Sequence, residues 1–131
     1  MPSTTPLNIL YVEDDLDIQV VAQIALEVVG GFKLRTCSSG AEALKAVQEG
    51  YYPDLLLLDV MMPNMDGPTT LQELRQLPAT AKTPVIFMTA KVQASEKEFY
   101  LSLGAIDVIA KPFDPMSLSS QVKQLWDASS R

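Results

Sequence analysis

Four short apolar runs along the chain predict buried β-strands. They cover residues 9–12, 55–58, 85–88 and 108–110. Each run is too short for a helix and lacks the polar alternation of a half-exposed strand, so it is typical of a strand buried on both faces of a parallel sheet. A weaker alternating segment, residues 33–37, predicts an edge strand in which Cys37 is a small apolar residue.

Segments with helical spacing separate the predicted strands. Asp15 and Asp17 stand where the dipole of a helix start favours acidic residues, and Gly30 follows where the helix should stop. The apolar stripe between them is Ile18, Val21, Ala22, Ala25, Leu26 and Val29.

Residue pairs with capping spacing predict the starts of three further helices. The pairs are Ser39 with Glu42, Ser95 with Glu98, and Asp114 with Pro115. In the helix predicted after Ser95, Phe99 and Leu103 are the expected core positions. Tyr100 falls on a different face of that helix, where we expect it to be exposed and to mark a partner surface.

A further helix is predicted by the apolar stripe Leu71, Leu74 and Leu77, which ends at Pro78. Five strands, each followed by a helix, predict an α/β protein with a doubly wound parallel sheet. Short connections between alternating strands and helices imply right-handed crossovers and helices on both faces. A length of 131 residues suits one domain. We expect that single domain to span residues 1–131, with a core over residues 8–126 and short polar tails at both ends.

The composition argues against several classes of function. Sixteen acidic residues stand against ten basic ones, with no cluster of Lys or Arg, so direct nucleic-acid binding is not expected. The absence of histidine excludes a His-based triad, a His-ligated zinc site and an internal phosphohistidine. Residues 1–6 lack the apolar stretch of a signal peptide, and no run approaches a membrane span, so we expect a cytoplasmic protein without membrane contact.

Polar residues follow directly after the predicted central strands. Glu13 and Asp14 follow the first strand, Asp59 the run at 55–58, and Thr89 and Lys111 the last two runs. The carboxyl ends of parallel strands lie at one edge of the sheet, where open α/β folds bind their ligands. We therefore expect carboxylates, a hydroxyl and an amine to converge there.

Carboxylates gathered at one edge need a positive partner. At a separation of ~5 Å and an effective dielectric constant of ~20, each ionised pair repels by about 3 kcal/mol. Oxygen ligands without histidine or thiolate favour Mg²⁺, or Mn²⁺, over zinc. A cation together with the Lys111 ammonium and the Thr89 hydroxyl suits a phosphoryl group, which leaves Asp59 as the nucleophile that attacks it.

Four motifs in this order resemble the receiver domains of two-component response regulators. They are LYVEDD at residues 10–15, LDVMMPNMDG at 58–67, MTA at 88–90 and AKPF at 110–113. The resemblance covers residues 8–126, and four motifs at family-like spacing make it specific. It implies the flavodoxin-like (βα)5 fold with strand order 2-1-3-4-5, as in single-domain regulators of the chemotaxis type.

The resemblance also implies a role for each candidate residue. Asp59 would accept a phosphoryl group, Lys111 would bind a phosphate oxygen, and Thr89 would move toward the new phosphate. The expected Mg²⁺ ligands are Asp14, Asp59, Met61 through its backbone carbonyl, and Glu13 through water. We expect a cis bond between Lys111 and Pro112. Such a domain catalyses only its own phosphorylation and dephosphorylation, and so is not an enzyme acting on other substrates.

The implied partners are other proteins. A sensor histidine kinase or a histidine phosphotransfer protein would supply the phosphoryl group, because this chain has no histidine. The signal would pass to a downstream protein target by contact. A phosphorylation-dependent dimer through the last two helices and the last strand is a further expectation from the family.

One position departs from the family pattern. Many receiver domains carry an aromatic residue three positions before the lysine, and its rotation accompanies the threonine shift. Val108 stands there, and a β-branched side chain that is stiff at χ1 cannot perform that rotation. We therefore expect the output movement to be a shift of residues 89–103.

Three alternative functions are weaker. A degenerate receiver would be a phosphorylation-independent docking module, but the full set of acidic and basic residues argues against it. An aspartyl-phosphate phosphatase of the haloacid-dehalogenase type has an acid two residues after its nucleophile, where this chain has Met61. A flavin-binding module needs a phosphate loop after the first strand, where Glu13 and Asp14 would repel phosphate.

Overall fold

The structure is a computed structural model that describes residues 7–129; the polar tail expected at residues 1–6 lies outside this range. Five strands alternate with five α-helices, a π-helical stretch (η1) and a short 3-10 helix (η2). The elements are β1 (Asn8–Val12), α1 (Leu16–Gln23), η1 (Ile24–Val29), β2 (Lys33–Cys37), α2 (Gly40–Gln48), β3 (Leu55–Asp59), α3 (Gly67–Leu74), η2 (Pro78–Thr80), β4 (Val85–Thr89), α4 (Ala94–Ser102), β5 (Asp107–Ala110) and α5 (Leu118–Ser129). The apolar runs therefore marked the strands to within a residue at each end.

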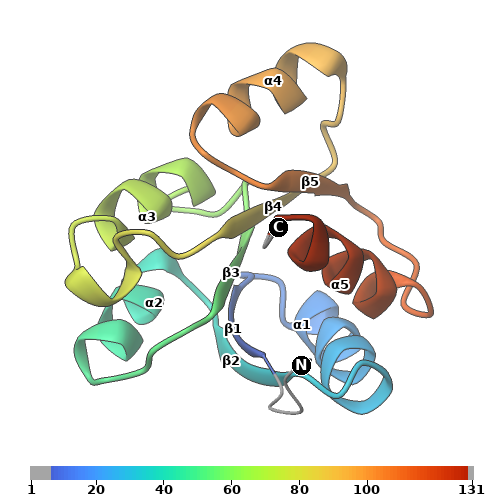
Figure 1. Cartoon of the computed structure of the whole chain (residues 1–131), viewed down its shortest axis with the longest axis horizontal. Helices are drawn as coiled ribbons and strands as arrows, with labels where there is room; N and C mark the ends of the chain where they lie inside the picture. Colours follow the sequence, from blue (N-terminus) through green and yellow to red (C-terminus); the bar gives the residue numbers. More distant parts are fainter. Residues whose placement is uncertain (1–6, 130–131) are drawn as a thin grey trace.

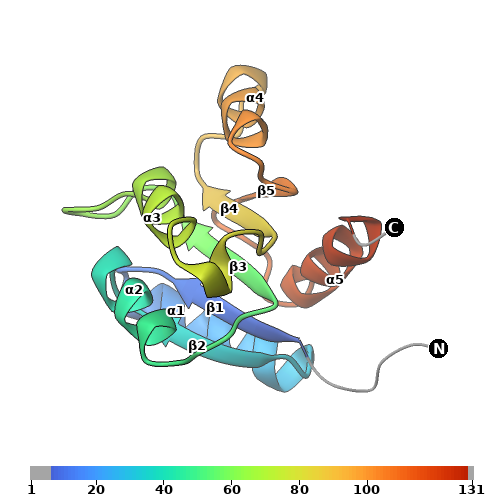
Figure 2. The same ribbon diagram turned by 60° about the vertical axis from the view of Figure 1, so that its left-hand side comes forward.

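The five strands form one parallel sheet. Their order is β2-β1-β3-β4-β5, which confirms the predicted doubly wound fold and strand order. Figure 1 shows α1 and α5 on one side of the sheet and α2 and α3 on the other. In Figures 1 and 2, α4 stands apart from the other helices, beyond the β5 edge. The central strands are covered on both faces, which explains why their sequences are continuous apolar runs.

Two hydrophobic clusters lie on the two faces of the sheet, and the strands supply alternate residues to each. Leu56, Leu58 and Phe87 face the cluster that packs against α2, α3 and α4. Leu57 and Ile86 face the cluster formed with α1, η1 and α5. All residues of β3 and β4 are buried. Because a strand turns alternate side chains to opposite faces, each central strand contributes to both clusters.

The helix starts follow the capping patterns only in part. Ser39 caps α2 as predicted, since its hydroxyl accepts the Glu42 N–H at 3.1 Å. The cap predicted at Ser95 is wrong: α4 begins at Ala94, and the Lys97 N–H bonds to the Gln93 carbonyl at 2.9 Å. The first turn thus runs from Gln93 to Lys97, and Ser95 lies inside it.

The last helix is displaced toward the C-terminus relative to the prediction. Helix α5 starts at Leu118, and Asp114 stands at the head of the turn that leads into it: its carboxylate accepts the Met116 N–H at 3.0 Å and its carbonyl accepts the Leu118 N–H at 3.0 Å. Helix α5 continues through the first three residues of the polar segment that follows residue 126 and ends at Ser129. The Ser129 hydroxyl donates to the Trp126 carbonyl at 2.8 Å and supplies a partner for that end of the helix.

Two helical faces differ from the expected ones. Val21 and Val29, expected in the core stripe, are 41% and 50% exposed. The π-helical stretch has more residues per turn, which rotates Val29 off the buried face. In α4 the expected faces are reversed, since Tyr100 is 7% and Phe99 is 53% exposed. Within residues 7–129, no helix combines the length and apolar character that crossing a membrane requires.

Candidate functional site

The residues predicted to converge do lie at one edge of the sheet. Glu13 directly follows β1, Asp59 ends β3, Thr89 ends β4 and Lys111 directly follows β5. The Val60 N–H bonds to the Met88 carbonyl at 3.0 Å, and the Lys111 N–H bonds to the Thr89 carbonyl at 2.9 Å. These bonds hold the ends of three neighbouring strands in register, so the polar side chains start from adjacent backbone positions.

Three carboxyl groups and one ammonium form the centre of the site. Carboxylate oxygens of Glu13, Asp14 and Asp59 all lie within 4.8 Å of one another. Glu13 and Asp59 are buried, whereas Asp14 is exposed to solvent. The Lys111 ammonium donates to Glu13 Oε1 at 2.8 Å and to Asp59 Oδ1 at 3.0 Å. The two buried carboxyl groups are therefore both in direct contact with a partly buried ammonium, which compensates part of the cost of removing them from water.

Burial and charge shift the pKa values of these groups. Burial raises the pKa of Glu13 to about 7, although the hydrogen bond from Lys111 acts in the opposite direction. Burial by itself would lower the pKa of Lys111, but its hydrogen bonds to Glu13 and Asp59 raise that pKa above the ordinary value. Burial also raises the pKa of the Tyr11 hydroxyl, and the charges of Glu13 and Asp59 raise it further. The Lys111 ammonium and the burial of Glu13 therefore act in opposite directions on the proton of Glu13.

Thr89 and Met61 stand at the margin of this cluster. The Thr89 side chain is buried, and its hydroxyl accepts the Lys91 N–H at 3.1 Å. The hydroxyl is therefore held toward the loop that leads to α4. Met61 lies two residues after Asp59 in the loop that follows β3, and its side chain is 65% exposed. Lys111 and Pro112 are joined by a cis peptide bond, as expected.

Local backbone structure explains how Asp14 and Asp59 are placed. Asp15 is the N-cap of α1, and its carboxylate accepts the N–H groups of Asp17 and Ile18, which confirms a structural role for this acid. On the other side, the first residue of α3, Gly67, lies against the end of β3. A Cβ atom at Gly67 would come within 2.5 Å of the Asp59 carbonyl oxygen. Only glycine allows this close approach.

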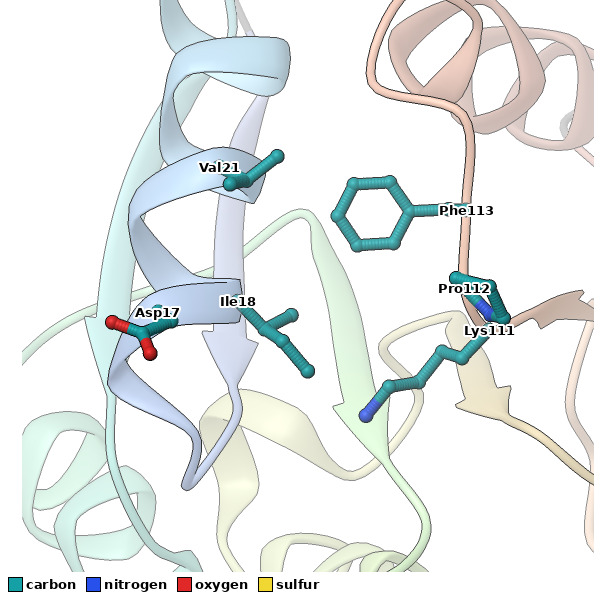
Figure 3. Close-up of a pocket in the computed structure, with 6 residues that line it drawn as sticks. All are labelled: Asp17, Ile18, Val21, Lys111, Pro112 and Phe113. Carbon is teal, nitrogen blue, oxygen red and sulfur yellow. The ribbon is translucent and has the colours of Figure 1, made fainter.

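Two features of the site were not predicted from the sequence. The Gln19 side-chain amide donates to the Glu13 carbonyl and, at 3.1 Å, to the Ser38 hydroxyl, so it ties α1 to the ends of β1 and β2. A polar residue beside the apolar stripe of α1 was the available signal. The second feature is an apolar groove of about 260 Å³ beside Lys111, lined by Ile18, Val21, Pro112 and Phe113 among others. Figure 3 shows the Phe113 ring directed toward Val21 across this groove.

The donor set fits a hard divalent cation. Glu13, Asp14 and Asp59 offer oxygen ligands only, at mutual distances suited to one ion, and Lys111 alone leaves net negative charge. The same edge presents an ammonium and a hydroxyl to an incoming anion. Fold and site together therefore define a class of protein: a doubly wound α/β domain with a carboxylate–lysine cluster at the carboxyl edge of its sheet.

Comparison with known proteins identifies the family within this class. The response regulator receiver domain family matches residues 9–123, so the chain belongs to the family of receiver domains. It is 36% identical over 118 residues to the transcriptional regulatory protein CpxR homolog of Haemophilus influenzae, covering 90% of this chain and 49% of that protein. The chain spans about half the length of the curated relatives that it matches.

Solved structures share the fold over nearly their whole length. The chemotaxis protein CheY4 of Vibrio cholerae superposes with a TM-score of 0.83 at 26% identity, covering 92% of this chain and 99% of that one. A putative response regulator from Chloroflexus aurantiacus superposes with a TM-score of 0.81 at 34% identity, with coverage of 94% and 99%. The chain is thus similar to receivers that were solved as separate chains as well as to parts of longer regulators.

Proposed function

We propose that this chain is a phospho-acceptor switch, in which Asp59 takes a phosphoryl group from a phosphohistidine on another protein. The observation that carries the proposal is the Asp59 carboxylate itself. It is buried at the end of β3, bonded to the Lys111 ammonium and adjacent to two further carboxyl groups. Membership of the receiver-domain family supports a signalling phospho-acceptor over an enzyme that turns over other substrates.

The proposed transfer uses the chain's own groups as follows. The Asp59 oxygen that does not bond Lys111 attacks the phosphorus atom, and the phosphorus–nitrogen bond of the donor breaks. The electron pair of that bond stays on the imidazole nitrogen, which takes up a proton. Lys111 compensates charge on a phosphoryl oxygen, and the Thr89 hydroxyl turns from Lys91 to donate to another.

The proposal includes a bound divalent ion, Mg²⁺ or Mn²⁺. The residues that would hold it are Asp14, Asp59, Met61 through its backbone carbonyl, and Glu13 through water. The ion would supply compensating positive charge for the carboxylates and the phosphoryl oxygens. The fit of three clustered carboxylates to an oxygen-ligand cation supports this part.

We propose two kinds of protein partner for a cytoplasmic chain. The phosphodonor is a sensor histidine kinase or a histidine phosphotransfer protein, and the apolar groove between α1 and Phe113 adjoins the Lys111 side chain that faces the incoming group. The receiver of the signal is a downstream protein target, and α4, β5 and α5 are the surface proposed for a phosphorylation-dependent dimer. The relatives named as transcriptional regulators are about twice as long, so their output is not assigned to this chain.

The deciding experiment is phosphorylation by acetyl phosphate in the presence of Mg²⁺. We expect the wild type to gain one base-labile phosphoryl group, and the Asp59→Asn variant to gain none. Asp54→Asn is the matched control, because Asp54 caps the Asn8 N–H at 2.9 Å away from the carboxylate cluster and an asparagine can still accept that bond. Label that persists in Asp59→Asn would move the acceptor elsewhere. Absence of label in the wild type would favour the docking-module alternative.

A further inference from the structure

Helix α4 buries one side chain against the rest of the molecule, and at the surface it also forms an ion pair with β5, between Lys97 and Asp107 at 3.3 Å. Among residues 94–102, all of them within the described part of the chain, only Tyr100 is buried, at 7% exposure. Its neighbours Phe99 and Leu101 are 53% and 39% exposed. The position of α4 therefore depends on where the Tyr100 ring packs.

The Tyr100 ring packs over the face of the sheet formed by β4 and β5. Its centroid lies 5.4 Å from that of Phe87, with the ring planes at 46°. Val108 is the residue of β5 opposite Phe87, and it packs against the same cluster. The aromatic ring that packs on this face therefore comes from α4, whereas β5 supplies a β-branched side chain there.

The same face of β4 connects this ring to the phospho-acceptor site. Val85 and Phe87 face the cluster that contains Tyr100, and Thr89 is the next residue of β4 with that orientation. The Thr89 hydroxyl accepts the Lys91 N–H at 3.1 Å, at the start of the short loop that ends at the N-cap of α4, Gln93. The segment from Thr89 to Tyr100 is thus attached at both of its ends to the same face of β4.

We propose that Tyr100 is the side chain through which phosphorylation at Asp59 changes the position of α4. This proposal rests on the phospho-acceptor function proposed above. When the Thr89 hydroxyl turns toward the phosphoryl group, the loop at 90–93 shifts, and Tyr100 re-seats on Phe87 and Val108. A ring enclosed in a close-packed cluster cannot move independently of its backbone, so α4 moves with it. The exposed Phe99 and Leu101 side chains on α4 are reoriented by the same movement.

Hydrogen–deuterium exchange of residues 90–103, with and without Mg²⁺ and beryllofluoride, tests the coupling. We expect wild type and Tyr100→Phe to show the same change in exchange when beryllofluoride binds. In Tyr100→Ala, exchange of α4 should already be roughly tenfold faster or more without beryllofluoride, since the buried anchor is lost, and should no longer respond to it. A beryllofluoride response in Tyr100→Ala equal to that of the wild type would overturn the proposal.

A packing test that needs no phosphorylation accompanies this measurement. If Tyr100 fills the space beside Val108, then Val108→Tyr crowds the two rings and lowers the urea midpoint of unfolding. Adding Tyr100→Ala should raise the midpoint above that of Val108→Tyr alone, whereas independent sites would lower it further. A further fall of the midpoint in the double variant would show that the two side chains do not share this space and would overturn the proposal.

The two measurements separate this proposal from the proposed function. Failure of the wild type to bind beryllofluoride or to accept phosphate from acetyl phosphate contradicts the phospho-acceptor function, whatever the double variant shows. Normal labelling of Asp59 combined with additive midpoints contradicts only the role of Tyr100.

Discussion

At the scale of single residues, the main feature of the site is that its carboxyl groups outnumber its ammonium group. Glu13 and Asp59 are buried and share the ammonium of Lys111, while Asp14 adds a third carboxyl group from the solvent side. One ammonium cannot compensate three carboxylates, so the protonation state of Glu13 and the presence of a cation both affect stability. This gives two predictions that can be tested without any partner protein.

The first prediction concerns pH. The pKa of Glu13 is raised by burial from 4.5 to about 7, so the folded state binds this proton more tightly than the unfolded chain does. The stability that this proton contributes is fully present below pH 4.5 and is lost as pH rises through about 7. In the presence of a chelator, we expect the free energy of unfolding to fall over that range in the wild type. Urea unfolding at a series of pH values measures it.

Glu13→Gln is the control for the pH prediction, because glutamine has the same shape and does not titrate. Its free energy of unfolding should lack the Glu13 contribution to the slope between pH 4.5 and about 7. Addition of Mg²⁺ should restore stability to the wild type above pH 7, where the carboxylate is ionised. An equal slope in both proteins would assign the pH dependence to other groups.

The second prediction concerns Lys111. Replacing it with methionine leaves Glu13 and Asp59 without a counter-charge, so Lys111→Met should lower the free energy of unfolding at pH 8. We expect a loss of about 2 kcal/mol without Mg²⁺, below the value for fully buried pairs because the Lys111 side chain is 16% exposed. Added Mg²⁺ should stabilise this variant more than the wild type, since the cation no longer meets a competing ammonium.

A surface lysine provides the comparison for Lys111. Lys97 pairs with Asp107 at 3.3 Å, and its side chain is 47% exposed. Lys97→Met should cost less than about 1 kcal/mol and leave the response to Mg²⁺ unchanged. Equal losses of unfolding free energy for Lys97→Met and Lys111→Met would contradict the role of Lys111 as the counter-charge of Glu13 and Asp59.

At the scale of elements, strands were predicted better than helices. Continuous apolar runs end where a strand leaves the core, and β3 and β4 have both faces covered, so their bounds could be predicted from the sequence. The helix starts depended on single capping residues: Asp15 caps α1 and Ser39 caps α2 as expected, whereas Ser95 does not cap α4. The start of α4 could not be predicted because its first turn closes on Gln93, a residue without a side-chain capping bond.

The junction between β3 and α3 gives a prediction at this scale. A methyl group at Gly67 would meet the Asp59 carbonyl oxygen at 2.5 Å and the Val60 Cα atom at 3.0 Å. Gly67→Ala should therefore push α3 away from the strand, cost about 1–3 kcal/mol, and slow labelling of Asp59 by acetyl phosphate several-fold. The measurements are urea unfolding and the labelling rate.

Gly31→Ala is the matched control for this junction. Gly31 has a φ of 74° and open space around its Cβ position, so the substitution adds backbone strain of about 1 kcal/mol without a clash at the site. It should destabilise the protein and leave the labelling rate unchanged. If Gly67→Ala also labelled at the wild-type rate, the close approach would matter for stability alone.

At the scale of the whole molecule, one sheet joins two hydrophobic clusters. Leu56 and Leu57 are consecutive residues of β3 and are both fully buried, but they face opposite clusters. Since every central strand contributes to both clusters, neither cluster can lose its packing while the other keeps it. The two faces should therefore unfold together.

The last prediction tests this cooperativity. Leu56→Ala and Leu57→Ala should each lower the free energy of unfolding by about 2–5 kcal/mol. Unfolding should remain a single transition when followed by far-UV circular dichroism and by the fluorescence of Trp126, which packs against only one of the two clusters. Separate midpoints for the two signals would indicate that the faces unfold independently.

The sequence by itself determined the strand positions and the identity of the acidic and basic residues at the sheet edge, and its resemblance to receiver domains implied the strand order. The physical reason is that buried parallel strands need unbroken apolar runs, and the first polar residue after each run marks the edge. Only the tertiary structure decided which partners those residues have: the Lys111 contacts with Glu13 and Asp59 join residues 98 and 52 positions apart. It also decided that Tyr100 faces the core, because the orientation of α4 depends on its packing against Phe87 rather than on the weak apolar pattern of the helix.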